Sequence, residues 1–177
     1  MPRKRCEILC VGTELLLGDI LNTNARFLAR ELSGLGLDLY YQTVVGDNER
    51  RLEEAVRRAL LRSDFLLITG GLGPTSDDIT KEVVARVFDR PLVMHEESLA
   101  ALKRFYDTTR RPMPRNNEKQ ALAPEGAIVL DNPQGTAPGY IVEDGAGHAA
   151  ILLPGPPREM TAMFRDKAAP WLRRFSH

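Results

Sequence analysis

The segment LITGGLGPTSDDITKE, residues 67–82, organises the whole chain. Together with Phe65 and Leu66 it begins as an apolar run of strand length, which is typical of a strand buried on both faces of a sheet. Gly70, Gly71 and Gly73 end that run, because glycine lets the backbone turn tightly and approach another molecule closely. The pattern after the glycines predicts a helix that starts near residues 77–78.

The glycine-rich loop is shaped to attract phosphate. Successive backbone amides followed by a helix N-terminus form a concavity that favours an anion. Asp78 and Glu82 are four residues apart, so on a helix they would share one face, where a divalent cation would relieve their repulsion. The pattern therefore predicts a phosphate-and-metal pocket, against the alternative that Asp77 is only a helix cap and that the other two acids are solvated.

The flanking sequence repeats the alternation of strand and helix. Glycines at 34 and 36 end the first helical pattern, and a Gly-Asp-Asn turn at 46–48 ends the second apolar strand. Such an order with short connections indicates a mainly parallel sheet with right-handed crossovers. The predicted strands are 6–12, 37–45 and 65–69, and the predicted helical patterns span 21–32, 52–60 and 79–88.

The second half of the chain is less regular. Apolar spacing predicts helices around 99–106 and 116–122, and a short strand over 127–130. The loop at 144–147 separates two further apolar runs, 139–143 and 148–153, and predicts a β-hairpin. A final helix is expected from Pro157. We expect residues 1–177 to form a single α/β domain.

Composition excludes several classes of function. The chain has 24 basic and 24 acidic residues, so its charge does not favour direct nucleic-acid binding. Cys6 and Cys10 lie on one predicted strand about 13 Å apart, beyond disulfide reach, which predicts reduced thiols and a cytoplasmic protein. No apolar run approaches the roughly 20 residues of a membrane span, and no membrane partner is expected.

Acidic side chains follow several predicted strands at their carboxyl ends. Glu14, Asp47, Asp78 and Glu159 occupy such positions, and in an open parallel sheet these ends share one edge, where ligands usually bind. Each loop taken alone could also need its glycine and polar residues merely to turn the chain or to cap a helix. Taken together, the loops favour a site, in which Glu14 would either support a metal-binding group or interact with the dipole of a helix.

Four motifs resemble the N-terminal, molybdopterin-binding-like domain of the CinA family. They are TGGLGPTSDDIT at 69–80, GTELLLG at 12–18, GTAPG at 135–139 and LPGPPREM at 153–160. The resemblance covers nearly the whole chain in the family's order. It implies a three-layer α/β/α fold with a mainly parallel sheet, shared with MogA- and MoeA-type molybdenum-cofactor proteins. The nicotinamide-mononucleotide deamidase domain of many members has no counterpart in these 177 residues, so the resemblance carries no inference about deamidase activity.

The resemblance also implies an activity, the metal-dependent hydrolysis of ADP-ribose to AMP and ribose 5-phosphate. It implies a homo-oligomer, either a dimer or a trimer, and adds cobalt to the magnesium or manganese that hard oxygen ligands favour. Asp78 and Glu82 are the expected metal ligands, and together with Glu14 and Glu159, either of which would be the general base, they form the expected catalytic set. The expected substrate-binding residues are Thr69, Gly70, Gly71, Gly73, Asp47, Asn117, Gln120, Gly135, Thr136, Gly155 and Arg158.

Two other classes of function remain open from the sequence. The domain could bind a pterin or a nucleotide without turnover, although a pure anion binder would favour arginine or lysine over carboxylates. It could also be an interaction protein linked to competence or DNA damage. Asn117 and Gln120 have alternatives as well, since their i,i+3 spacing suits the capping of their own short helix.

Overall fold

The computed structural model describes residues 2–176 and contains a six-stranded sheet in the order β2-β1-β3-β8-β7-β6. Strands β2, β1, β3 and β8 run parallel, and β7 and β6 complete the sheet in antiparallel fashion. A separate antiparallel pair joins β4 to β5. The strands are β1 Arg5–Val11, β2 Asp38–Val45, β3 Phe65–Thr69, β4 Leu92–Met94, β5 Leu122–Pro124, β6 Ile128–Leu130, β7 Gly139–Glu143 and β8 Ala149–Leu153.

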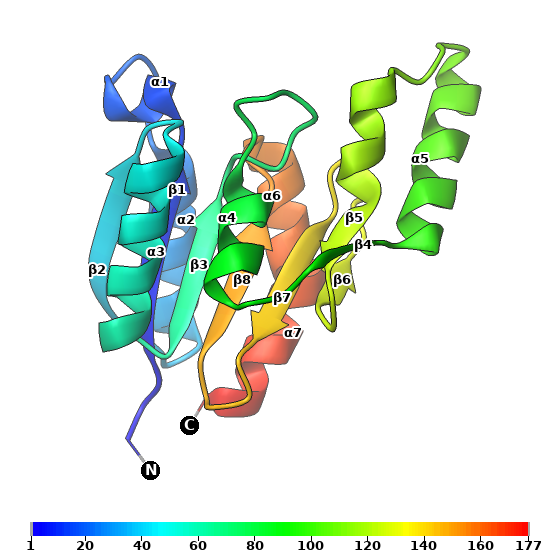
Figure 1. The fold of residues 1–177 in the computed structure, drawn as a ribbon. Helices are drawn as coiled ribbons and strands as arrows, with labels where there is room; N and C mark the ends of the chain where they lie inside the picture. The colour runs from blue at the N-terminus through cyan, green and yellow to red at the C-terminus, as the bar shows by residue number, and fades with distance from the viewer. Residues whose placement is uncertain (1, 177) are drawn as a thin grey trace.

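Helices cover both faces of this sheet (Figure 1). One apolar core lies between the sheet and α2, α6 and α7, and the other lies between the sheet and α3 and α4. This is the expected three-layer α/β/α architecture. The helices are α1 Thr13–Leu16, α2 Thr23–Gly34, α3 Glu49–Arg62, α4 Thr80–Val87, α5 Glu96–Thr109, α6 Pro157–Met163 and α7 Ala169–Leu172, with a 3₁₀ helix η1 at Arg115–Ala121.

Burial on both faces explains why β3 is uniformly apolar. All five residues of β3 are buried, because alternate side chains enter opposite cores: Leu67 packs toward α2 and α6, and Leu66 toward α3 and α4. The predicted hairpin is confirmed, with β7 and β8 paired from Tyr140–Leu152 to Glu143–Ala149. The C-terminal helix is longer than its first segment, since a π-helical turn at Phe164–Ala168 joins α6 to α7.

Two sequence-based boundaries are wrong. The helix expected from residues 77–78 starts at Thr80, because the Asp78 carboxylate accepts hydrogen bonds from Thr75 and holds the preceding residues in a turn. Leu21 does not belong to the apolar stripe of the next helix, since it precedes α2 and is exposed. The short helix α1 before it was not predicted, because its leucine-rich sequence shows no amphipathic period.

The segment from β4 to β5 forms an arm that stands beside the main body in Figure 1. It comprises β4, α5, η1 and β5, and its strand pair was not predicted because each strand has only three residues. No helix within the described residues is both long and apolar enough to cross a membrane.

Candidate functional site

Strand register brings three loops to one edge of the sheet. Cys10 of β1 is paired with Thr69 of β3, and Thr69 is paired with Leu153 of β8, so these parallel strands end side by side. The loops that follow them, together with the loop after β2, enclose a cleft of about 660 Å³, a volume within the usual range of small-molecule sites. The cleft therefore lies at the carboxyl edge of the parallel strands, where the sequence predicted the site.

The glycine loop forms one wall of this cleft. Gly70 and Gly71 both have positive φ angles, of 99° and 72°, which place the backbone in the region that favours glycine. The Gly70 amide donates to the Leu153 carbonyl at 3.1 Å, and the Gly70 carbonyl accepts the Thr80 hydroxyl at 2.8 Å. Gly70 is therefore committed to holding the loop in place, which corrects the expectation that its amide would face a phosphate.

The next three amides of the loop remain available. Within residues 2–176 the backbone N–H groups of Gly71, Leu72 and Gly73 donate to no acceptor, while all three residues line the cleft. Unpaired amides at a cleft wall are the groups that bind phosphate oxygens in nest-like loops. A ligand with several anionic oxygens would satisfy all three donors.

Asp78 and Glu82, expected to act together, are separated by the structure. Asp78 lines the cleft, whereas Glu82 lies outside it, with its carboxylate 3.9 Å from the Lys119 ammonium. The pair fails to share a helix face because Asp78 lies in the turn before α4, where its Oδ2 accepts from the Thr75 amide at 2.9 Å and the Thr75 hydroxyl at 2.7 Å. Asp78 is therefore the one member of the pair that can meet a ligand in the cleft.

Lys119 secures the same turn from the arm. Its ammonium donates to the Thr75 carbonyl at 2.6 Å and to the Asp78 carbonyl at 2.8 Å, and its own carbonyl accepts the Lys81 ammonium. Hydrogen bonds from a charged ammonium to backbone carbonyls are stronger than hydrogen bonds between two neutral groups. Sequence reasoning missed Lys119, because only the fold brings η1 beside the loop that follows β3.

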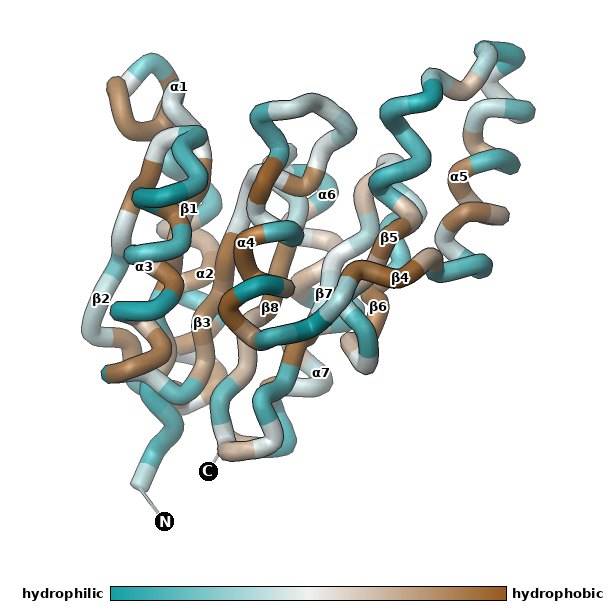
Figure 2. The backbone as a smooth tube through the Cα atoms, in the orientation of Figure 1, coloured by the Kyte–Doolittle hydropathy of each residue, from teal (hydrophilic) through white to brown (hydrophobic). Residues whose placement is uncertain are grey.

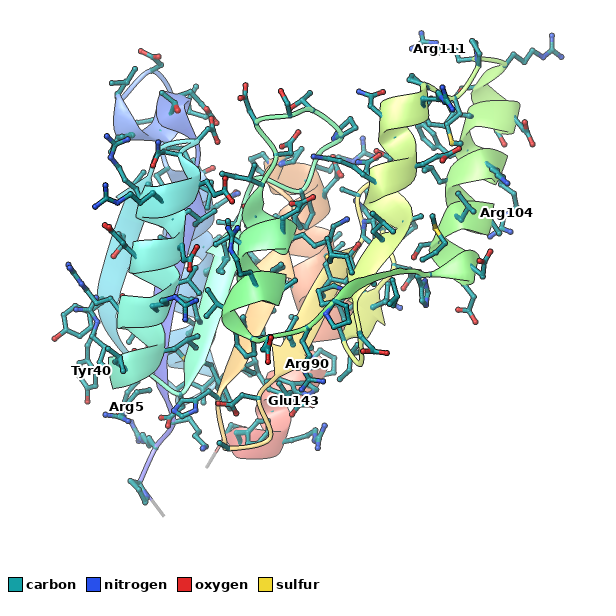
Figure 3. All side chains as sticks on the ribbon, in the orientation of Figure 1. Arg5, Tyr40, Arg90, Arg104, Arg111 and Glu143 are labelled. Carbon is teal, nitrogen blue, oxygen red and sulfur yellow. The ribbon has the colours of Figure 1, made fainter. Side chains whose placement is uncertain are left out.

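The cleft collects acidic side chains and no basic ones. Five carboxylates line it, and among the described residues no lysine, arginine or histidine does so. The labelled arginines in Figure 3 (Arg5, Arg90, Arg104 and Arg111) all lie away from the edge where β1 and β3 end. The five acidic residues are Glu14, Asp47, Asp77, Asp78 and Glu159.

These carboxylates differ in how they are held. Asp47 is tied to Thr13 by reciprocal hydrogen bonds of 3.1–3.3 Å, which anchor α1 to the loop after β2. Glu159 accepts from the Asn132 amide at 2.7 Å. Glu14 makes no hydrogen bond or ion pair with another side chain in the part of the chain that the structure describes. Glu14 and Asp77 are thus the two cleft carboxylates whose oxygens no other described group engages.

Thr69 and Asn24 join the strand ends beneath the cleft. The Asn24 amide donates to the Thr69 hydroxyl at 2.9 Å and to the Gly155 carbonyl at 2.8 Å, and the Thr69 hydroxyl donates to the Pro154 carbonyl at 3.0 Å. The expected substrate-binding residues Thr69 and Gly155 both line the cleft, but the Thr69 hydroxyl is already used. Asn24 was missed, although the polar Asn-Thr-Asn sequence opening an amphipathic helix at this edge was a visible signal.

The remaining expected substrate-binding residues lie around the opposite wall. Thr136 lines the cleft, and its hydroxyl accepts from the amide of buried Gln120 at 3.2 Å. Buried Asn117 donates to Gln120 at 3.1 Å and to the Tyr106 hydroxyl at 2.6 Å. Neither Asn117 nor Gln120 lines the cleft, and the one contact of this pair with the lining is the hydrogen bond from Gln120 to Thr136.

Gly135 and Arg158 also lie off the cleft lining. A Cβ atom at Gly135 would come 2.1 Å from a Glu159 oxygen, so glycine is needed there to make room for that carboxylate. Arg158 is exposed, in the first turn of α6, and points to no described acidic partner. The structure thus places Glu82, Asn117, Gln120, Gly135 and Arg158 outside the cleft that holds the other expected site residues.

No three or more acidic, histidine or cysteine side chains among residues 2–176 are arranged to hold a metal ion by themselves. Magnesium commonly binds through one or two carboxylates and completes its shell with water and substrate phosphate. The donor chemistry of the cleft, with Asp78 and the neighbouring acids, matches that partial ligand set. The pair Asp78 and Glu82 does not provide it, because Glu82 lies elsewhere.

The buried Lys81 side chain makes the free energy of unfolding depend on pH. Burial lowers the pKa of Lys81 to about 8, with nearby Lys119 lowering it further and Glu82 opposing the shift. An unfolded lysine has a pKa of about 10.4. Between about pH 8 and 10.4 the unfolded chain retains a proton that the folded chain releases, so stability attributable to this group rises with pH.

We therefore expect the free energy of unfolding of the wild type to rise relative to that of Lys81→Met between about pH 8 and 10. Below pH 8 both states of the wild type are protonated, and the difference between the two proteins should be constant. Urea unfolding of both proteins from pH 7 to 10 measures this difference. Curves that stay parallel across the whole range would contradict the lowered pKa.

The fold and the site together define a class of protein, an α/β/α domain that carries an acidic, glycine-walled ligand cleft at the carboxyl edge of its parallel strands. Residues 7–174 match a family model described as "Probable molybdopterin binding domain". A "CinA-like protein" from Dictyoglomus turgidum is 54% identical over 172 residues, which cover 97% of this chain and 42% of that protein. The chain belongs to the CinA family, as its motifs indicated.

A crystal structure of the protein CinA from Thermoplasma acidophilum, whose function is described as unknown, agrees with this assignment. It is 34% identical, has a TM-score of 0.86, and covers 95% of this chain and 98% of that one. Relatives from two Caldicellulosiruptor species, 55% and 57% identical over 170 residues, carry names that refer to competence and damage induction. The chain spans about two fifths of the length of these curated relatives.

More distant structures share the fold. The molybdopterin biosynthesis enzyme MoaB from Thermus thermophilus is 21% identical, with a TM-score of 0.62 over 96% of this chain and 91% of that chain. This likeness confirms the molybdenum-cofactor-biosynthesis type of fold expected from the sequence. At this identity it extends to architecture alone.

Proposed function

We propose that this domain hydrolyses ADP-ribose to AMP and ribose 5-phosphate with the help of a divalent cation. The observation that carries the proposal is the composition of the cleft, with five carboxylates, three unpaired amides and no basic side chain among the described residues. A diphosphate would meet strong repulsion there unless a cation entered with it. The family resemblance supports ADP-ribose as the diphosphate, and the cleft chemistry supports the dependence on a metal.

In this mechanism, backbone amides of the glycine loop bind the diphosphate and cleft carboxylates bind the cation. The amides of Gly71, Leu72 and Gly73 would bind anionic oxygens of the diphosphate. Asp78, with Asp47 or Glu159 as neighbours in the cleft, would hold magnesium, manganese or cobalt. When bound, such a cation neutralises charge that develops on phosphoryl oxygens during hydrolysis.

Glu14 is the stronger candidate for the general base. A base must reach a water molecule and carry a carboxylate that is not already engaged, and Glu14 has no side-chain partner among the described residues, whereas Glu159 accepts from Asn132. In hydrolysis the water proton passes to this carboxylate as the water oxygen bonds to phosphorus. The bond from phosphorus to the bridging oxygen then breaks, and AMP and ribose 5-phosphate leave.

The test is direct incubation of the protein with ADP-ribose and magnesium, manganese or cobalt, with chromatographic separation of the products. We expect equal amounts of AMP and ribose 5-phosphate, and none after chelation of the cation. The variant Glu14→Gln should keep the same fold and lose most of this turnover, by about 100-fold or more. If no cation supports product formation while ADP-ribose still binds, the domain is a nucleotide-binding module without turnover.

A direct role in DNA binding is not supported by the site. The cleft is acidic, and phosphate backbones are bound chiefly by lysine and arginine side chains. The competence-related names of relatives are compatible with enzymatic processing of a nucleotide. Tight, salt-sensitive retention of DNA by the protein would favour DNA binding over nucleotide hydrolysis as the function of this domain.

A further inference from the structure

The loop from α1 to α2 exposes an unusual concentration of large aliphatic side chains. Leu16, Leu17, Ile20 and Leu21 are exposed by 54%, 69%, 53% and 86%. Figure 2 shows this end of the molecule as a hydrophobic stretch of tube near α1, above the edge of the sheet. Exposed aliphatic groups gathered in one loop commonly mark a surface that another molecule covers.

Two of these four residues face the acidic cleft. Ile20 and Leu21 line it together with the glycine loop, whereas Leu16 and Leu17 do not. Figure 1 shows the α1 loop and the loop after β3 rising separately above the same sheet edge. The cleft thus has an apolar wall and a wall of unpaired amides.

The apolar wall is held in place independently of any ligand. The Asp47 carboxylate accepts from the amide and the hydroxyl of Thr13 at 3.3 and 3.2 Å at one end of the loop. At the other end the Asn22 side chain caps α2 by accepting from the Ala25 amide at 3.2 Å. These hydrogen bonds hold the backbone at both ends of the loop that carries the exposed Leu21 side chain.

We infer that Ile20 and Leu21 form a subsite for the planar, uncharged base of a nucleoside diphosphate, and so make the site selective for nucleotides over simple diphosphates. A diphosphate has no group that an aliphatic side chain could bind favourably, whereas the face of a purine gains from leaving water. This inference rests on the proposed function only for the diphosphate part of the ligand. A second copy of the chain covering the same leucine is the competing occupant.

The test uses two ligands that cannot be hydrolysed, α,β-methylene-ADP and methylenediphosphonate, each titrated calorimetrically in magnesium buffer. We expect the nucleotide to bind at least about tenfold more tightly than the base-free ligand, since an apolar contact of this size is worth about one order of magnitude. Leu21→Ser should remove most of that advantage and leave methylenediphosphonate binding unchanged. Ile20→Ser should act in the same direction.

Leu17→Ser is the matched control, because Leu17 is exposed on the same loop and does not line the cleft. It should change neither affinity. Equal weakening of both ligands by Leu21→Ser, or no weakening of either, would overturn the inference. So would a change in oligomeric state, measured by light scattering, that accompanies Leu21→Ser without a change in nucleotide affinity.

The experiments distinguish failure of the proposed base subsite from failure of the proposed hydrolysis of ADP-ribose. Base-dependent binding that requires Leu21 without any release of AMP from ADP-ribose would uphold the subsite and refute the turnover. Metal-dependent release of AMP that is unaffected by Leu21→Ser, with unchanged affinity for both probes, would uphold the turnover and refute the subsite.

Discussion

Asp78→Asn is expected to lower metal-dependent turnover of ADP-ribose by roughly 100-fold, a loss of about 3 kcal/mol of transition-state stabilisation. The substitution removes the charge of a carboxylate that lines the cleft. It leaves an amide oxygen that can still accept from Thr75, so the turn before α4 should persist. Steady-state kinetics with varied cation concentration, supported by the thermal midpoint of unfolding, measures both effects.

The matched variant is Glu82→Gln. From sequence spacing alone both acids would be metal ligands and both variants would be inactive, but the structure places Glu82 outside the cleft beside Lys119. We expect Glu82→Gln to stay within about threefold of wild-type turnover, because a partly exposed ion pair with its charged atoms 3.9 Å apart contributes little. Equal inactivation of the two variants would contradict the placement of the cation site, as would an active Asp78→Asn protein.

Gly70→Ala should produce the largest loss of stability among single substitutions in the loop. Gly70 has φ of 99°, where an L-residue is strained by about 1–2 kcal/mol. Its new Cβ would also lie 2.3 Å from the Val11 carbonyl oxygen, a backbone atom that cannot move without shifting β1. Overpacking of this kind adds about 1–3 kcal/mol, so we expect a total of about 2–5 kcal/mol in urea unfolding.

Gly18→Ala separates these two costs. Gly18 also has a positive φ, of 80°, but a Cβ there would meet no atom within 4 Å. This variant should therefore lose only the conformational contribution of about 1–2 kcal/mol. Equal destabilisation by the two substitutions would show that steric contact with β1 is not what requires glycine after β3.

The layered fold was predictable because its signals are local. Five consecutive apolar residues in β3 indicate a strand covered on both faces, and the spacing of apolar residues in α3 and α4 indicates which side each helix buries. The loop at residues 144–147 likewise indicated the hairpin of β7 and β8. The pairing of β4 with β5 escaped prediction, because three-residue strands carry no measurable period.

The candidate site was predictable in its position and less so in its members. Glycines and acids after successive strands located the cleft, since parallel strands end at a common edge. Asp78 and Glu82 show why the members of the site could not all be predicted. Their spacing implies a shared helix face, but Asp78 lies in a turn hydrogen-bonded to Thr75, before the helix begins. Asn117 and Gln120 are a second example, since both side chains are buried and only Gln120 contacts a residue of the cleft lining, Thr136.

Local sequence patterns were thus sufficient for the order of the six strands of the main sheet and of the helices that cover it, for the glycine-rich loop after β3, and for the acidic character of the edge. Tertiary packing alone decided that the Gly70 amide donates to Leu153, that Lys119 holds the turn of Asp78, and that Ile20 and Leu21 line the same cleft as the carboxylates. The physical reason is that hydrogen bonds and contacts between residues distant in the chain depend on register and packing, and neither leaves a periodic trace in the sequence.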